Sequence, residues 1–536
     1  MTLDGIRACP LCGVASRESV LAEAGWIDAA TESRIREQSP DWQRQHGACP
    51  ACVQQALLSL LVQKGEGVLG RVIQDVWPLD ANAAFGALPT PLRMRADPRF
   101  SGHGVTVAVI DAAFYPHDDL VKPRNRIRAF VDAAAEKGET RNFGPNERPS
   151  WPGSEALTAA QWHGLMTSCA LAGNGCKSHG LYRSLAADAD LVLLQVRGDD
   201  GRIGTTRLIR ALRWVRDNAT SYGIRVVNAS LGVAPETPDA LAEIDALVAD
   251  LLARDVSVVV AAGNDGERSL AAPATAPDAV TVGGLDDMNV FDPGARSLWH
   301  SNFGMATDGM EKPELVAPSL WVVAPILPNT DTAWEAQDLF ARRAAGDSSA
   351  ERRIAELRLV TPHYQHVEGT SFAAPIVSGI VACMLEANPT LRAADVRELL
   401  TSACYEVAGA QRERQGAGAI DAGRAVAAAL AAASGVVTTQ VRSPVIDDGQ
   451  PSVCLLDRRA VSVRVLGSWD NWRQPGTLAR QQRPGVWKAA LGPLATGEYA
   501  YKLLIDDVRW IADPANPLRA HDGVGGWNSA LVVRGN

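Results

Sequence analysis

Residues 104–111, with the sequence GVTVAVID, form an unbroken apolar run that ends in an aspartate. A strand with one face in water alternates apolar and polar residues, whereas a strand covered on both faces is apolar throughout. Three more such runs follow, ADLVLLQV at 189–196, IRVVNASLG at 224–232 and VSVVVAAGN at 256–264. The segments between these runs have helical patterns. The alternation predicts an α/β domain with a mostly parallel sheet and helices on both faces.

The pattern along the 536 residues changes at three places, which suggests several domains. We expect an N-terminal module and linker at 1–95, the α/β domain at 96–435, a polar linker at 436–454, and short alternating strands at 455–536. The charged stretch at 335–358, EAQDLFARRAAGDSSAERRIAELR, predicts a helical insertion on the surface of the α/β domain.

Composition excludes some classes of partner. The formal net charge of −9 argues against a dedicated nucleic-acid-binding protein. The N-terminal residues lack a basic region followed by an apolar run, and the alanine-rich stretch 423–437 is too short to span a bilayer. Nine cysteines without an export signal argue against a disulfide framework. We therefore expect a cytoplasmic protein with no membrane or nucleic-acid partner.

Four polar residues stand where parallel sheets place their sites. Asp111 ends one buried strand, and Asn264 follows another. His163 stands at the start of a helix, where Gly164 permits close approach, and Ser371 lies where a loop meets an apolar helix. These are the parts that acyl transfer needs. A hydroxyl attacks, an imidazole moves the proton, a carboxylate orients the imidazole, and an amide donates to the oxyanion.

Each of these residues also has a structural interpretation. Ser371 could cap the helix that begins beside Thr370 and Phe372, since serine often accepts backbone N–H groups there. A lone histidine is usually a structural residue, and an asparagine after a strand often forms a turn. The order Asp, His, Asn, Ser on a parallel-sheet background favours catalysis over these alternatives.

Six motifs between residues 96 and 435 resemble the successive signatures of the subtilisin-like serine proteases: VAVID, HG, NASLG, AAGN, KPELVAP and GTSFAAP. The resemblance implies a serine endopeptidase that acts on polypeptides. It implies a triad of Asp111, His163 and Ser371, with Asn264 as the oxyanion donor. It also implies further substrate contacts: a groove at Ser230, Leu231 and Gly232, and a pocket at Ala262 and Gly263 with Asp265 near its rim.

The chain departs from the family pattern in places. Leu165 replaces the usual threonine after His-Gly, and Ser319 replaces the usual glycine after VAP. The insertion before Ser371 is larger than usual, which would reshape the cleft. His117 matches the family's loop after the aspartate and is given a structural role. A calcium site, common in relatives, cannot be assigned from these residues.

The N-terminal module contains two CxxC pairs, Cys9 with Cys12 and Cys49 with Cys52. Two such pairs offer four thiolates, the ligand set of a tetrahedral structural zinc site. Redox pairs or unrelated buried thiols are the alternatives. We further hypothesise that this module and the segment ALPTPLRM at 87–94 cover the cleft and restrain the protease until a signal arrives.

The C-terminal segment alternates like a half-exposed β-sandwich. It resembles the glycogen-binding module of AMP-activated kinase β subunits and related early-set domains. The resemblance implies that Trp472 and Trp510 stack on sugar rings, while Lys502 and Asn528 hydrogen-bond sugar hydroxyls. Asp507 replaces a turn glycine, and Gly526 lacks a hydroxyl that the binding loop often offers, so a protein-docking role is the alternative. The whole chain could then be a catalytically quiet or glucan-anchored scaffold.

Overall fold

The computed structural model describes most of the chain. The described residues are 6–11, 15–17, 29–48, 52, 56, 88–97, 99–135, 138–178, 180–198, 200–289, 296–433, 443–447, 450–456, 460, 462–483, 486–507, 509–513, 515–516, 518–521 and 527–533. They belong to two compact units, Met1–Val426 and Ala427–Asn536.

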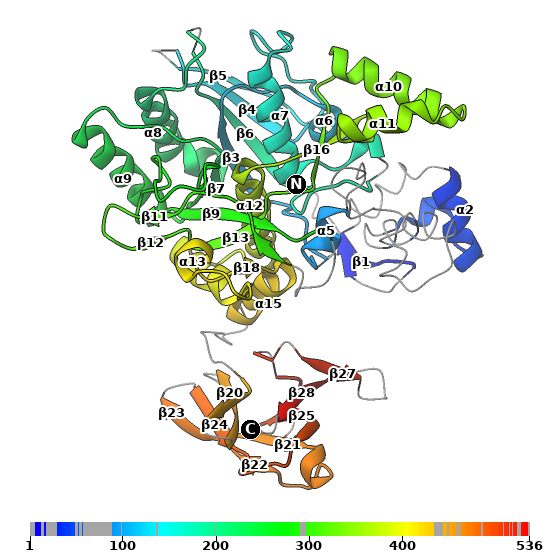
Figure 1. Cartoon of the computed structure of the whole chain (residues 1–536), viewed down its shortest axis with the longest axis vertical. Coiled ribbons are helices and arrows are strands. Elements are labelled where there is room, and N and C mark those ends of the chain that lie inside the picture. Colours follow the sequence, from blue (N-terminus) through cyan, green and yellow to red (C-terminus); the bar gives the residue numbers. More distant parts are fainter. Residues whose placement is uncertain are drawn as a thin grey trace. The chain divides into compact units, whose positions relative to one another are not determined.

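An 11-stranded sheet forms the centre of the first unit (Figure 1). Its strand order is β17-β18-β13-β9-β8-β7-β3-β6-β4-β5, with β10 paired to β9. Neighbours from β18 to β4 run parallel, whereas β4–β5, β17–β18 and β9–β10 are antiparallel. The mostly parallel sheet predicted from the sequence is confirmed. Its strands are β3 (Thr106–Asp111), β4 (Ile127–Asp132), β5 (Glu139–Asn142), β6 (Asp190–Gln195), β7 (Ile224–Ala229), β8 (Ser257–Ala261), β9 (Val280–Asp286), β10 (Ser297–Leu298), β13 (Leu315–Pro318), β17 (Cys404–Tyr405) and β18 (Ala419–Ile420).

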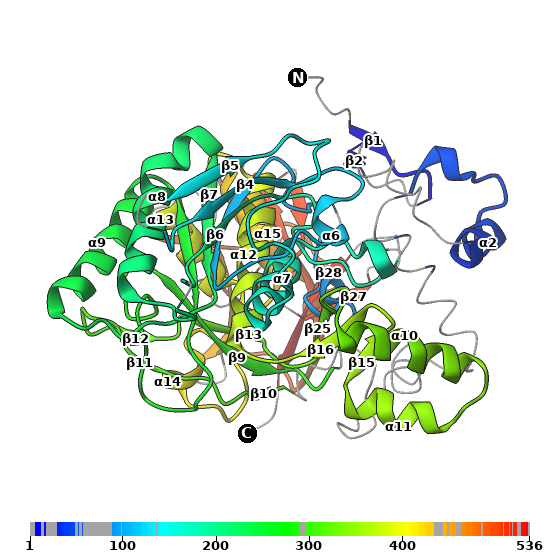
Figure 2. The same cartoon turned by 90° about the horizontal axis from the view of Figure 1, so that it is seen from above.

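Helices cover both faces of this sheet (Figures 1 and 2). Successive side chains of a strand point to opposite faces, so Ala108 and Ile110 of β3 join the core beneath α8 and α9. The other face packs against α12, which lies across β7, β8, β9 and β13 and beside α7. The helices of this unit are α5 (Thr90–Arg93), α6 (Asp118–Val121), α7 (Ala159–Ala172), α8 (Thr205–Tyr222), α9 (Pro238–Ala253), α12 (Thr370–Ala387), α13 (Ala393–Ser402), α14 (Arg412–Gln415) and, across the division between the units, α15 (Ala422–Ala433).

Helix α12 is the central helix of the fold. Among the described helices, it alone is long and apolar enough to cross a membrane, but 83% of that stretch is buried inside the protein. A helix that is apolar all round is buried on all sides. Its apolar character is therefore explained by its place in the core.

The predicted insertion before α12 is helical, as expected. It consists of α10 (Asp331–Ala344) and α11 (Ser349–Glu356), which pack on each other, followed by strand β15 (Leu359–Thr361). Strands β14 (Val322–Pro325) and β16 (Tyr364–Val367) flank the insertion and pair antiparallel with each other. The insertion is thus anchored by a hairpin that leads directly into α12. A second, smaller hairpin joins β11 (Gly304–Met305) and β12 (Glu311–Lys312).

The N-terminal residues contain a short antiparallel hairpin, β1 (Ile6–Ala8) with β2 (Ala15–Arg17), and helix α2 (Ala29–Gln38). A small core of Ile35, Trp42, Ala48 and Ala56 supports this part.

Residues 88–97, which we call the anchor segment, join the α/β fold through Arg93. Its guanidinium group donates two hydrogen bonds to the Asp287 carboxylate, at 2.9 and 2.7 Å. It also donates to the carbonyls of Leu320 and Trp321, at 2.7 and 2.5 Å. The side chains of Arg93 and Asp287 are 1% and 4% exposed. The anchor segment is therefore held against the α/β fold by a buried ion pair.

The second unit consists of two antiparallel sheets, with orders β19-β20-β24-β23 and β22-β21-β25-β28-β27, the latter joined by β26. Inward side chains of both sheets, among them Val453, Trp487, Val465 and Tyr501, share one core. The strands are β19 (Val445–Asp447), β20 (Gln450–Leu456), β21 (Val463–Gly467), β22 (Thr477–Leu478), β23 (Arg480–Arg483), β24 (Val486–Ala490), β25 (Gly497–Ile505), β26 (Arg509–Ile511), β27 (Arg519–His521) and β28 (Trp527–Val533).

Candidate active site

The carboxyl ends of three neighbouring strands supply one wall of the site. The order β8-β7-β3, with Asn228 opposite Val109 and Val259, aligns the strand ends at one edge of the sheet. Asp111 ends β3, Ser230 follows β7 and Asn264 follows β8. Three residues far apart in the sequence are therefore neighbours because parallel strands end together.

Asp111 is 1% exposed, and its buried carboxylate is fully engaged. One oxygen lies 2.8 Å from Nδ1 of His163 and also accepts the Ala112 N–H at 2.6 Å. The other oxygen accepts the Thr167 hydroxyl at 2.7 Å. A buried charge needs such partners, and here they also fix the direction of the imidazole.

His163 stands on α7, whose first turn is closed by a capping box between Thr158 and Gln161. The helix approaches the sheet so closely that a Cβ at Gly164 would lie 1.9 Å from the carbonyl oxygen of Ala113. Glycine after His163 is thus required by packing. Burial alone would lower the pKa of His163, but the charge and hydrogen bond of Asp111 outweigh it, so the pKa lies above its usual value of 6.5.

Ser371 stands in the first turn of α12, after Gly369, whose φ of 130° is a conformation that side chains rarely adopt. Its hydroxyl donates to the carbonyl of Ser230 at 3.5 Å, and Gly369 occupies the N-cap position, so Ser371 does not cap the helix. The next residue, Phe372, places its ring 6.1 Å from that of His163. The start of α12 therefore lies beside the imidazole.

The side-chain oxygen of Asn264 accepts both the backbone N–H and the hydroxyl of Thr370, at 3.0 and 2.8 Å. These bonds fix the orientation of the amide, so its NH₂ group points away from Thr370. A Cβ built on Gly369 would lie 3.4 Å from that nitrogen and 3.8 Å from the backbone nitrogen of Ser371. The amide nitrogen of Asn264 therefore lies close to the start of α12.

The sequence reasoning missed a buried network behind Ser371. Ser378 donates to Asn228 at 2.9 Å, Asn228 donates to the Ser230 hydroxyl at 3.0 Å, and Ser230 donates to the Ser371 carbonyl at 2.8 Å. Thr167, which donates to Asp111, was missed as well. A polar residue inside an apolar strand, as Asn228 is, was the available signal, because a buried amide needs partners.

The residues assigned to substrate binding lie around these groups. Ser230 is buried, Leu231 is half-buried and Gly232 is exposed, directly before a bridge from Val233 to Ala272.

Of the assigned pocket residues, Ala262 is buried and Gly263 is half-buried, while Asp265 is exposed. Asn302 holds this turn by accepting the Asp265 N–H at 2.7 Å and donating to its carboxylate at 3.2 Å. A side chain at Gly263 would collide with the Asn302 amide, which would lie 2.6 Å from the new Cβ.

Two of the four cysteines assigned to zinc lie within the described residues. The Sγ atoms of Cys9 and Cys52 are 3.9 Å apart, although 43 residues separate them in the chain. Thiolates at about 2.3 Å from a tetrahedral zinc ion would be about 3.8 Å apart, so the spacing fits this metal. Cys12 and Cys49 lie outside the described residues.

Three of the residues assigned to sugar binding share one face of the second sheet in the C-terminal unit. Tyr501 of β25 pairs with Ser529 of β28. The next residues in the same register, Lys502 and Asn528, lie opposite each other and point to the other face of the sheet. Trp510, which is 44% exposed, pairs with Leu504, two residues along the strand from Lys502. Asn528 is only 8% exposed.

Trp472, the fourth, follows β21 in a loop. Gly476, in the same loop, lies against Leu466 of β21. A Cβ added at Gly476 would lie 2.5 Å from the Leu466 side chain. Leu466 is the β21 partner of Lys502, so the loop lies over the same face.

Comparisons with known proteins show which family this chain is similar to. The model of the Subtilase family matches residues 102–418. Serine protease AprX of Bacillus subtilis is 28% identical over 337 residues, 61% of this chain and 67% of AprX. Subtilisin BL of Lederbergia lenta is 25% identical over 300 residues, 56% of this chain and 83% of that protein. The solved structure of Sphericase covers 57% of this chain and 84% of its own, at 23% identity and a TM-score of 0.41. This chain is therefore a serine endopeptidase and belongs to the Subtilase family.

Proposed function

We propose that the endopeptidase acts through an Asp111–His163–Ser371 triad, with Asn264 and the Ser371 N–H as oxyanion donors. The Ser371 Oγ bonds to the scissile carbonyl carbon, and its proton passes to His163. The oxyanion so formed accepts the two N–H groups. The C–N bond then breaks as His163 gives the proton to the leaving amine. Water then attacks the acyl carbon and loses a proton to His163. The bond between that carbon and the Ser371 Oγ breaks, and His163 returns the proton to the Ser371 oxygen.

The 2.8 Å contact between Asp111 and His163 carries this proposal. This contact fixes the orientation of the His163 imidazole. Its Nδ1 is held by the Asp111 carboxylate, which leaves Nε2 available to accept a proton from a hydroxyl. The test is labelling of the full chain by a fluorophosphonate probe, which reacts with an activated serine. We expect labelling to disappear in Ser371→Ala and to persist in Ser348→Ala, an exposed serine of the insertion. Labelling that survives Ser371→Ala would refute the triad and favour the catalytically quiet scaffold.

We propose that the substrate is an extended polypeptide that adds a strand beside Ser230, Leu231 and Gly232. The exposure of Gly232 leaves room for a main chain to approach, and main-chain pairing of this kind gives affinity with little sequence selectivity. Comparing newly formed N-termini in a proteome treated with active or Ser371→Ala protein would identify the preferred sequences. Cleavage confined to one residue type before the scissile bond would assign the selectivity to the pocket at Ala262 and Gly263.

We propose that the N-terminal module is a zinc-stabilised regulator and that the protease works in the cytoplasm. The Cys9–Cys52 spacing supports zinc. Cys169, Cys176, Cys383 and Cys404 are not in disulfides, as a reducing compartment favours. Regulation is tested by comparing the full chain with a protein that begins at residue 86 and so keeps the anchor segment. Higher peptidase activity without the module supports restraint, whereas equal or lower activity in soluble protein counts against it.

For the second unit we propose an early-set β-sandwich that binds glucan. The face shared by Lys502, Asn528 and Trp510, with the Trp472 loop over it, supports this proposal, since exposed indoles stack on sugar rings. Co-sedimentation with amylose should be lost in Trp510→Ala and kept in the control Leu478→Ala, which removes another exposed apolar side chain. No co-sedimentation of the unchanged protein would favour docking to a protein partner.

A further inference from the structure

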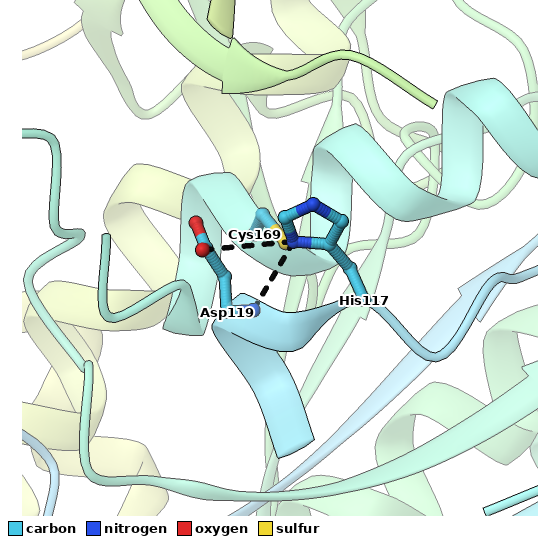
Figure 3. Close-up of side chains that lie close together, drawn as sticks. All are labelled: His117, Asp119 and Cys169. Atoms are coloured by element: carbon cyan, nitrogen blue, oxygen red, sulfur yellow. Dashed lines mark hydrogen bonds and ion pairs between the residues drawn. The ribbon is translucent and has the colours of Figure 1, made fainter. Parts of the chain in front are cut away.

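A buried polar cluster lies behind the catalytic residues. His117 and Asp119 come from α6 and its N-terminal flank, and Cys169 comes from α7 (Figure 3). The three side chains are between 1% and 5% exposed, and their donor atoms lie within 4.8 Å of one another. Tyr364 of β16, itself 1% exposed, joins them by donating its hydroxyl to the Asp119 carboxylate, 2.9 and 2.8 Å from the two oxygens.

A metal ion is the first occupant to consider, because histidine, carboxylate and thiolate all bind zinc. The hydrogen bonds already present argue against it. Nδ1 of His117 accepts the Asp119 N–H at 3.1 Å as the cap of α6, and the carboxylate holds the Tyr364 hydroxyl. Burial raises the pKa of Cys169 well above its usual value and so opposes the thiolate that a metal needs. Nδ1 of His117 and the Asp119 carboxylate are therefore hydrogen-bonded without an ion.

The position of the cluster in the chain is more informative. Asp119 lies eight residues after Asp111, Cys169 lies six after His163, and Tyr364 lies seven before Ser371. The cluster therefore ties together the three segments that carry the triad. The Lys177 N–H also donates to the Tyr364 hydroxyl at 3.2 Å, which links the loop after α7 to the same point.

We propose that the Asp119–Tyr364 hydrogen bond is a positioning contact of the active site, an inference that rests on the proposed triad. It fixes β16 to the α6–α7 layer. From Tyr364 only a short stretch of chain leads through Gly369 to the start of α12, so the bond constrains where the Ser371 hydroxyl meets the His163 ring. Helix α7 packs against β14, the other strand of this hairpin, and the Asp119–Tyr364 bond adds a directional constraint to that packing. A misplacement of about 1 Å can cost 100-fold in rate.

A buried arginine ties together the two helices that carry the cluster. Arg126, 2% exposed, donates to the main-chain carbonyls of Asp119 in α6 and of Ala172 at the end of α7. The carboxylate that accepts the Tyr364 hydroxyl is therefore carried by a helix that is itself fixed to α7.

The test is Tyr364→Phe in the full chain, with kcat expressed per active site titrated by the fluorophosphonate probe. We expect kcat to fall about tenfold or more with KM within twofold, because the loss is in alignment and not in binding. The matched control is Tyr222→Phe, which removes another tyrosine hydroxyl that donates to a side-chain oxygen, that of Asn142 at 2.7 Å. This control lies on α8, across the sheet, and should leave kcat unchanged.

A second variant, Asp119→Asn, keeps an acceptor for the Tyr364 hydroxyl and should retain more kcat than Tyr364→Phe. The proposal is overturned if Tyr364→Phe lowers only the melting temperature or the fraction of titratable sites, with kcat per site unchanged. It is also overturned if His117→Gln reduces the metal content of the purified protein, which would make the cluster a metal site. Failure of the triad itself is seen separately, as labelling that persists in Ser371→Ala.

Discussion

The buried pair of Arg93 and Asp287 allows a quantitative prediction for the anchor segment. Replacing Arg93 with methionine keeps the apolar stem but leaves the Asp287 carboxylate, 4% exposed, without its cation. Removing one partner of a buried ion pair costs about 3–5 kcal/mol. Unfolding entropy is about 2.1 cal/mol/K per residue, so for a cooperative unit the size of Met1–Val426 this loss lowers the melting temperature by roughly 3–6 °C.

The assay is differential scanning calorimetry on Ser371→Ala protein, a background chosen to prevent self-cleavage during heating. The matched control is Arg99→Met. Arg99 pairs with Asp97 at 2.5 Å, but its side chain is 45% exposed, and such surface pairs contribute about 0–1 kcal/mol. The double change of Arg93→Met with Asp287→Leu should recover much of the loss, since it removes the stranded charge. If Arg93→Met shifts the melting temperature no more than Arg99→Met, the reasoning about this pair is wrong.

Three further predictions concern the catalytic site and the N-terminal module. Asn264→Ala removes one oxyanion donor and should lower kcat about 100- to 1000-fold with little change in KM, a magnitude known from subtilisin itself; a change under tenfold in steady-state kinetics would exclude Asn264 from this role. His163 must be neutral to accept a proton, so kcat/KM should fall as the pH drops through the raised pKa of His163, which lies above 6.5. In Asp111→Asn the activity should be about 10⁴-fold lower, and the fall of kcat/KM on the acid side should occur at lower pH than in the unchanged protein. A fall at the same pH in both proteins would contradict the assignment. Cys9→Ser and Cys52→Ser should each reduce the bound zinc measured by mass spectrometry, and unchanged zinc in both would place the ion elsewhere.

The sequence by itself determined the parallel sheet and the candidate catalytic residues. Unbroken apolar runs such as 104–111 identify strands covered on both faces, and the polar residues that end them mark one edge of the sheet. The glycine after His163 and the apolar helix after Ser371 were also visible as local patterns. Local rules suffice for such features, since periodicity and chain order do not depend on which segments meet.

Only the tertiary structure decided which distant side chains touch. Asn228, Thr167 and Tyr364 carry no local mark of their partners, because each hydrogen bond depends on strand register and on how closely a helix packs. In the sequence nothing distinguishes Arg93 from the other arginines near it. In the structure its side chain is almost fully buried against Asp287. A buried polar group must find its partner wherever the fold places one, and folding brings together residues whose separation in the chain gives no clue to it.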